Sequence, residues 1–144
     1  AVHVLLHAYA TYRKRGRRPA RLVIVGRGPL EQELKSIAAK LNIGADIVWV
    51  GFREDVPAVM MAYDTFVLTS SYEGFGLVLL EAMAAARPVI ATAVSAIPEI
   101  VQDNVTGLLC PPGDHARIGA AMIQLEDPDE RARLGSAGKV RAIE

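Results

Sequence analysis

The stretch that decides the fold is SSYEGFGLVLLEAMAAARP, residues 70–88. An apolar run with strand character, residues 65–69, leads into it, so a strand, a turn with two glycines and a helix follow one another. The helical part is apolar on every side except at Glu81. Burying a carboxylate costs free energy unless it is hydrogen-bonded, so we expect another side chain or a ligand to satisfy Glu81.

The turn in this stretch suits an anionic group. Gly74 and Gly76 stand beside the first amides of the helix, which lack partners within the helix. Because glycine has no side chain, an anion can approach the backbone closely there. Together with Glu81, which can accept hydrogen bonds from hydroxyls, the turn predicts a ligand that carries both hydroxyls and phosphate.

Apolar runs and helical segments alternate outward from this stretch in both directions. Strands are expected at residues 22–25, 47–50, 65–69, 88–92 and 107–110, with helices at 2–14, 29–41, 55–62, 77–86, 98–102, 115–125 and from 128 onward. This alternation predicts an α/β fold with a Rossmann-like, doubly wound parallel sheet that is covered on both faces. Ligands bind at the carboxyl ends of such strands, so the turns at 26–29, 51–52, 70–76 and 92–97 should border one cleft.

Composition favours one compact domain, with no linker or second domain expected in residues 1–144. Hydrophobic residues make up 51% of the chain, and 16 basic residues balance 16 acidic ones, so nothing indicates a nucleic-acid partner. Cys110 is the single cysteine and lies in an apolar run, which excludes an internal disulfide and predicts a core residue. No apolar run is long enough to span a membrane. The start at Ala1, without an initiator Met, is typical of a piece cut from a longer protein.

Two motifs resemble metal ligands and are better explained otherwise. His3 and His7 share one helix face, but no third ligand is nearby in the sequence. Asp127 and Asp129 form an Asp-x-Asp pattern, yet Asp127 followed by a proline is typical of a helix N-cap. We therefore expect no metal site.

Several short motifs, taken in order, make the chain similar to the C-terminal, donor-binding domain of the group 1 retaining glycosyltransferases. These enzymes have the GT-B architecture, in which two Rossmann-like domains face each other, and they use nucleotide-sugar donors. The motifs are residues 21–29, 50–52, the glutamates at 73 and 81 with seven residues between them, 87–92, 97–101, 106–109 and 111–114. No single motif is specific, but their order and spacing are, and they cover nearly the whole chain.

The resemblance implies roles for individual residues. Glu73, the candidate catalytic residue, would meet the hydroxyls of the donor sugar, Glu81 would bind the ribose hydroxyls, and the amides of residues 75–77 would bind the sugar and diphosphate. The implied donor-binding set is Gly26, Gly28, Gly51, Phe52, Glu73, Gly74, Phe75, Gly76, Leu77 and Glu81. The family needs no metal or other cofactor beyond the nucleotide-sugar substrate. The alternatives are an ion pair with Arg27, Arg53 or Arg87 for Glu81 and a solvated loop acid for Glu73.

The chain departs from the family pattern in two places. Ala93, Ser95 and Ala96 stand where many members carry an acid and two glycines. The family's first strand, with a turn that bears an Arg and a Lys for the diphosphate, would precede residue 1. In the strand order 3-2-1-4-5-6 that strand lies between those at 22–25 and 65–69. The gap must therefore be closed by direct pairing of these two strands, by another chain, or by further residues.

The resemblance implies a transferase that moves a hexosyl group from a nucleotide-diphosphate sugar to a glycan or lipid-linked acceptor in polysaccharide biosynthesis. The expected partners are the nucleotide sugar, a missing N-terminal acceptor domain and a second copy joined through unpaired strand edges. The expected location is the cytoplasm, either in solution or at the inner face of the membrane. Alone, the chain should be inactive. The alternatives are a nucleotide-sugar 2-epimerase domain and a non-catalytic fragment that binds a nucleotide sugar or a partner chain.

Overall fold

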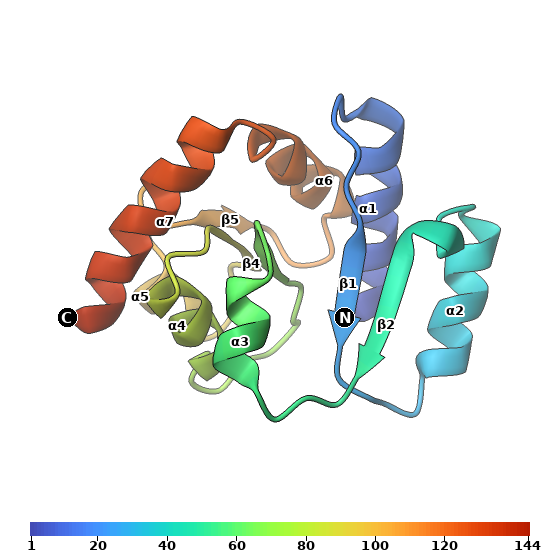
Figure 1. Ribbon diagram of the computed structural model, residues 1–144, viewed down its shortest axis with the longest axis horizontal. Coiled ribbons are helices and arrows are strands. Elements are labelled where there is room, and N and C mark those ends of the chain that lie inside the picture. Colours follow the sequence, from blue (N-terminus) through green and yellow to red (C-terminus); the bar gives the residue numbers. More distant parts are fainter.

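Strands and helices alternate along the chain as the sequence pattern predicts (Figure 1). The computed structural model describes residues 1–144, and every expected strand and helix is present within a few residues of its expected bounds. In chain order the elements are α1 (Val2–Arg15), β1 (Leu22–Val25), α2 (Glu31–Lys40), a 3-10 turn (Gly44–Asp46), β2 (Ile47–Gly51), α3 (Val56–Met61), β3 (Phe66–Leu68), α4 (Leu77–Ala84), β4 (Val89–Thr92), α5 (Ile97–Ile100), β5 (Leu108–Cys110), α6 (His115–Gln124) and α7 (Pro128–Ile143).

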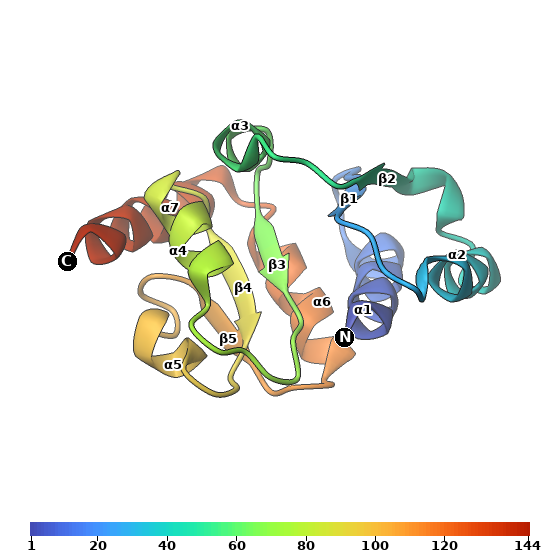
Figure 2. The same ribbon diagram turned by 90° about the horizontal axis from the view of Figure 1, so that it is seen from below.

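All strand pairs are parallel, but the strands form two sheets instead of one. β1 pairs with β2, with Leu22 opposite Ile47, and a separate sheet has the order β3-β4-β5, with Phe66 opposite Val89. Figure 2 shows the two groups side by side, with β1, β2 and α2 at one end and β3, β4 and β5 between them and α7, which lies at the other end. The α/β class with parallel strands is confirmed. Because β1 and β3 do not pair, direct pairing does not close the gap that the sequence predicts.

Helix α1 holds the two sheets together because it contributes to two hydrophobic cores. Val4 and Ala8 join a core with residues of α6 and β4, whereas Leu6 and Tyr9 join a core with residues of α2 and β2. A third core lies between α4, β4 and α5. The contact of α1 with α6 is close, since a Cβ added at Gly119 would lie 3.0 Å from the carbonyl oxygen of Ala8. The relative position of the two sheets therefore depends on α1.

The helix starts are partly as expected. Asp114 and Asp127 are N-caps: their carboxylates accept hydrogen bonds from the amides of Arg117 at 3.0 Å and Asp129 at 2.9 Å. The Asp-x-Asp pattern is thus a helix cap. The expected start of α2 at residue 29 is wrong, because the chain turns before Leu30 and the helix begins at Glu31.

Burial of the strands differs from the expectation for three of them. β4 is buried at all four residues, as predicted for a strand covered on both faces, but β1 and β3 have no buried residue and β2 has one. Cys110 lies in the core, as expected, and burial raises the pKa of its thiol to about 11. No helix is both long enough and apolar enough to cross a membrane.

Candidate functional site

The turn at residues 70–76 joins β3 to α4 and is held in place by hydroxyl groups at the carboxyl ends of two strands. The fully buried Thr92, the last residue of β4, donates a hydrogen bond from Oγ1 to the carbonyl oxygen of Ser70 at 2.5 Å. Thr69 donates from Oγ1 to the carbonyl oxygen of Ala1 at 2.9 Å. The start of the turn is therefore fixed relative to β4 and to the beginning of α1.

Gly76 is the N-cap of α4 and needs to be glycine. Its φ of +64° lies in the left-handed region, and a Cβ there would lie 2.8 Å from Cδ1 of Ile100. Gly74 differs, because a Cβ at that position would have no neighbour within 4 Å. The amides of residues 75–78 have no hydrogen-bond acceptor in the protein, whereas those of Leu79 and Leu80 donate to the carbonyl oxygen of Gly76. Four amides at the start of α4 thus have no acceptor in the protein, a geometry that suits an anion.

Glu73 is half-buried in this turn, and both its side chain and its backbone amide form a hydrogen bond. Its Oε2 accepts a hydrogen bond from Oγ of Ser70 at 3.2 Å, and its backbone amide donates to Oγ of Ser95 at 3.4 Å. Ser95 itself has a φ of +50°, which is uncommon for a residue with a side chain. The carboxylate is therefore oriented by the protein, and its Oε1 has no protein partner. A freely solvated loop acid, the alternative for Glu73, does not describe this arrangement.

Glu81 lies on α4 with an exposed side chain, so the expectation that it is buried is wrong. The helix buries Leu79, Ala82 and Met83 on its other side, while Glu81 borders a large cavity between β1 and β3. None of the ion pairs considered for Glu81 forms: Arg53 pairs with Asp55, with 2.7 Å between Nε and Oδ1. The face of α4 that carries Glu81 is open because no strand lies beside β3 there.

The glycine turns after β1 and β2 lie together, but neither glycine lines the cavity that Ser70 borders, so one cleft shared with the turn at 70–76 stays a prediction. The amide of Gly26 donates to the carbonyl oxygen of Gly51 at 2.7 Å, and their φ values are +113° and +79°. Gly28 has no neighbour within 4 Å of an added Cβ, and Phe52 is 66% exposed, so the surface beside these turns is open. The structure therefore brings Gly26 and Gly51 together, separated from the turn at 70–76 by the space between the sheets. No group of three or more His, Cys, Asp or Glu side chains is placed to hold a metal ion.

Comparison with known proteins shows the family to which the chain belongs. The family model described as glycosyl transferases group 1 matches residues 1–141. The chain belongs to this family. A curated relative, N-acetyl-alpha-D-glucosaminyl L-malate synthase of Bacillus anthracis, is 38% identical over 114 residues, which are 79% of this chain and 30% of the relative.

Two solved structures show which part of a group 1 glycosyltransferase the chain represents. HepE of Anabaena, in complex with UDP and glucose, is 28% identical with a TM-score of 0.88, over 97% of this chain and 39% of HepE. The C-terminal domain of the group 1 protein LpcC from Francisella tularensis is 28% identical with a TM-score of 0.87, over 99% of this chain and 77% of that one. The chain spans about a third of the length of its curated relatives and corresponds to the C-terminal domain of a GT-B glycosyltransferase.

Three supporting residues of this group 1 domain were not predicted as such from the sequence. Ser70, Thr92 and Ser95 hold the turn and Glu73 through their hydroxyls or backbone. A threonine at the last position of a buried strand is a signal that could have identified Thr92. The hydrogen bond from Glu73 to Ser95 joins residues 22 positions apart and has no local sequence signal.

Proposed function

We propose that residues 1–144 form the donor-binding domain of a retaining glycosyltransferase that moves a hexosyl group from a nucleotide-diphosphate sugar to a glycan or lipid-linked acceptor. The observation that carries the proposal is the start of α4, where four amides without acceptors lie between Glu73 and Glu81, each of which has unpaired carboxylate oxygen. The UDP and glucose named with HepE support a nucleotide-sugar donor for this chain as well.

The chemistry of glycosyl transfer matches this arrangement. As the bond to the anomeric carbon breaks, positive charge develops on the sugar and negative charge on the leaving diphosphate. Amides fixed at the start of a helix stabilise that negative charge without reorganising during the reaction. We assign this role to the amides of Phe75, Gly76 and Leu77, with no metal ion. In this proposal Glu73 accepts hydrogen bonds from the sugar hydroxyls and Glu81 from the ribose hydroxyls.

The remaining donor contacts come from the turns after β1 and β2. We assign Gly26 and Gly28 to close approach of the diphosphate, and Gly51 and Phe52 to the border of the base. The acceptor would bind mostly to the N-terminal domain of a complete enzyme, so the isolated chain should transfer no sugar. The proposed location is the cytoplasm or the inner face of the membrane, where nucleotide sugars meet lipid-linked acceptors.

Calorimetric titration tests the two glutamates separately. Each of UDP, GDP and ADP, and the matching nucleotide sugar of whichever binds, is titrated into the wild type, Glu81→Gln and Glu73→Gln. A hydrogen bond to a charged group contributes about 1.5–3 kcal/mol, so Glu81→Gln should weaken binding of the nucleotide at least roughly tenfold. Glu73→Gln should leave nucleotide binding unchanged and weaken binding of the nucleotide sugar, because only the sugar contacts Glu73.

Asp129→Asn is the matched control, since Asp129 is an exposed acid in the first turn of α7 and lies far in the sequence from every turn assigned to the donor. It should bind like the wild type. Equal affinity of the wild type and Glu81→Gln would overturn the ribose assignment. Binding of no nucleotide by the wild type would favour a non-catalytic, partner-binding domain.

A further inference from the structure

The end of α1 and the loop that follows it carry the highest density of positive charge in the sequence. Six of the 16 basic residues fall within residues 13–21, at positions 13, 14, 15, 17, 18 and 21. Figure 1 shows this loop and the end of α2 at the same edge of the molecule, where β1 and β2 begin. The turns assigned to the donor follow the carboxyl ends of the strands, so the proposed donor site does not use this charge.

The backbone of the loop is fixed to the helices on both sides of it. The amide of Gly16 donates to the carbonyl oxygen of Tyr12 at 2.6 Å, and the Tyr12 hydroxyl donates to the carbonyl oxygen of Arg18 at 2.7 Å. The carboxylate of Glu126, which follows α6, accepts a hydrogen bond from the amide of Arg17 at 2.9 Å. A Cβ at Gly16 would lie 2.6 Å from Oε1 of Glu126, so glycine allows this close contact.

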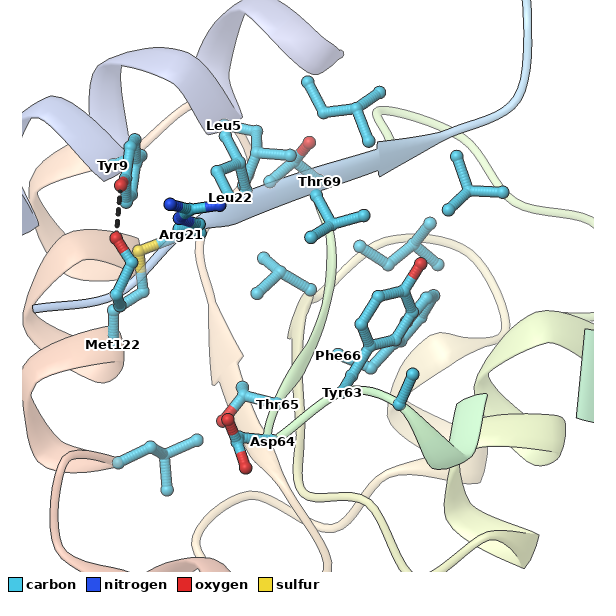
Figure 3. A pocket seen from close by; sticks show the side chains of 18 of the residues that line it. Leu5, Tyr9, Arg21, Leu22, Tyr63, Asp64, Thr65, Phe66, Thr69 and Met122 are labelled. Carbon is cyan, nitrogen blue, oxygen red and sulfur yellow. Dashed lines mark hydrogen bonds between the residues drawn. The ribbon is translucent and has the colours of Figure 1, made fainter. Parts of the chain in front are cut away.

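Three of the six basic side chains are turned to other parts of the protein. The Tyr9 hydroxyl donates to the carbonyl oxygen of Ala20 at 2.6 Å, the dashed line in Figure 3, and Arg21 lies beside Tyr9 in this view. Arg18 and Arg21 both line the cavity between β1 and β3. Arg13 forms an ion pair with Asp46.

Four basic side chains at this edge are exposed and form no hydrogen bond or ion pair within the protein. The acids close to them are already bonded, Asp46 to Arg13 and Glu126 to the amides of the loop. The helix dipole favours cations in the last turns of α1 and α2, but Arg17 lies beyond the C-cap of α1 and has no such explanation. We call the four side chains the basic edge: Lys14, Arg15, Arg17 and Lys40.

The surroundings of the basic edge favour a partner that is recognised by charge alone. No large hydrophobic side chain within residues 13–21 is exposed, and specific protein interfaces depend on apolar or aromatic anchors. The segment therefore also lacks the exposed aromatic rings on which single-stranded nucleic acid stacks. An anionic membrane surface requires neither feature, because Lys and Arg side chains are attracted to its phosphate groups electrostatically.

We propose that the basic edge binds the phosphate groups of an anionic phospholipid membrane. The fixed backbone of the loop holds Arg17 at the edge before binding, so the loop itself does not have to be ordered when the membrane binds. The inference goes beyond the proposed function and uses no residue of the donor site. Its failure would leave the assignment of the donor site unchanged.

Cosedimentation of residues 1–144 with lipid vesicles tests the proposal. The wild type should bind vesicles that contain phosphatidylglycerol and phosphatidylcholine, and should not bind vesicles of phosphatidylcholine alone. Binding should be lost at about 0.5 M NaCl, because salt screens exposed charges. A basic residue near an anionic surface strengthens binding about fivefold, so Arg15→Gln/Arg17→Gln should bind roughly 25-fold more weakly. Arg15→Lys/Arg17→Lys keeps both charges and should bind like the wild type.

Arg117→Gln/Lys139→Gln is the matched control, since it removes the same charge from two exposed side chains of α6 and α7 that also lack partners. It should bind like the wild type, and thermal unfolding checks that all variants are folded. Equal weakening in the control and in Arg15→Gln/Arg17→Gln would make net charge the cause and overturn the proposal. Absence of binding by the wild type would overturn it as well. Tighter binding to RNA than to the vesicles at the same salt concentration would make nucleic acid the partner instead.

Discussion

The strands β4 and β1 have similar sequences and different surroundings. β4 reads VIAT, pairs on both edges and is buried at all four residues; β1 reads LVIV, pairs on one edge and has no residue classed as buried. A short apolar run therefore specifies a strand in both places, but burial depends on what lies beside it. In the three-stranded half of the molecule β4 has a partner strand on each side, whereas in the two-stranded half β1 has an unpaired edge that borders the cavity between β1 and β3.

The largest expected effect tests this difference with one matched pair of substitutions. Ile90 in β4 is fully buried and Ile24 in β1 is half-buried. Ile90→Ala should lower the free energy of unfolding by about 3–5 kcal/mol, because it leaves a cavity in a closed core, and Ile24→Ala by about 1–2 kcal/mol. Urea unfolding of both variants measures the difference. Equal losses of unfolding free energy would mean that β1 and β4 are packed equally well, which would contradict the difference in burial between the two strands.

The second prediction concerns the turn that the three-stranded half supports. Gly76→Ala places a Cβ at a φ of +64° and 2.8 Å from Ile100, so it should cost about 1–3 kcal/mol of stability. Gly74→Ala, two residues away, meets no atom within 4 Å and should cost less than about 1 kcal/mol. Thermal unfolding distinguishes them. A loss for Gly74→Ala as large as that for Gly76→Ala would show that the whole turn, and not one residue of it, requires glycine.

Local features of this fold could be predicted from the sequence, and distant contacts could not. The strand and helix positions and the caps at Asp114 and Asp127 follow from patterns within a few residues. The exposure of Glu81 could not be predicted in this way, because the apolar sequence of α4 indicates burial on all sides. Only the structure shows that one side of the helix borders the cavity beside β3. The contact of Glu73 with Ser95 likewise depends on how two turns from different strands meet.

A third prediction follows from that contact between turns. Ser95→Ala removes the acceptor for the amide of Glu73, and a typical hydrogen bond contributes about 0.5–1.5 kcal/mol. If Ser95 positions Glu73, binding of the nucleotide sugar should weaken by about two- to tenfold while binding of the nucleotide alone stays unchanged. Calorimetric titration with both ligands measures this. Ser95→Asn, which keeps a side-chain oxygen as acceptor and tolerates the left-handed backbone at this position, is the conservative control, and equal weakening for both ligands would contradict a positioning role.

The smallest expected effect comes from surface charge, which should not distinguish the two halves. Arg133 holds the pKa of Glu130 at about 2, below its usual 4.5, through a hydrogen bond of 2.7 Å on α7. Because the pKa is lowered in the folded state, the stabilisation is present above pH 4.5 and is lost as the pH falls toward 2.

NMR titration should show the Glu130 carboxyl returning toward its usual pKa in Arg133→Met. That variant should leave the difference between Ile90→Ala and Ile24→Ala unchanged at pH 7, since an exposed ion pair contributes little to stability. If the difference between the two isoleucine variants shrank instead, surface charge on α7, and not strand pairing, would account for the stability of the three-stranded half.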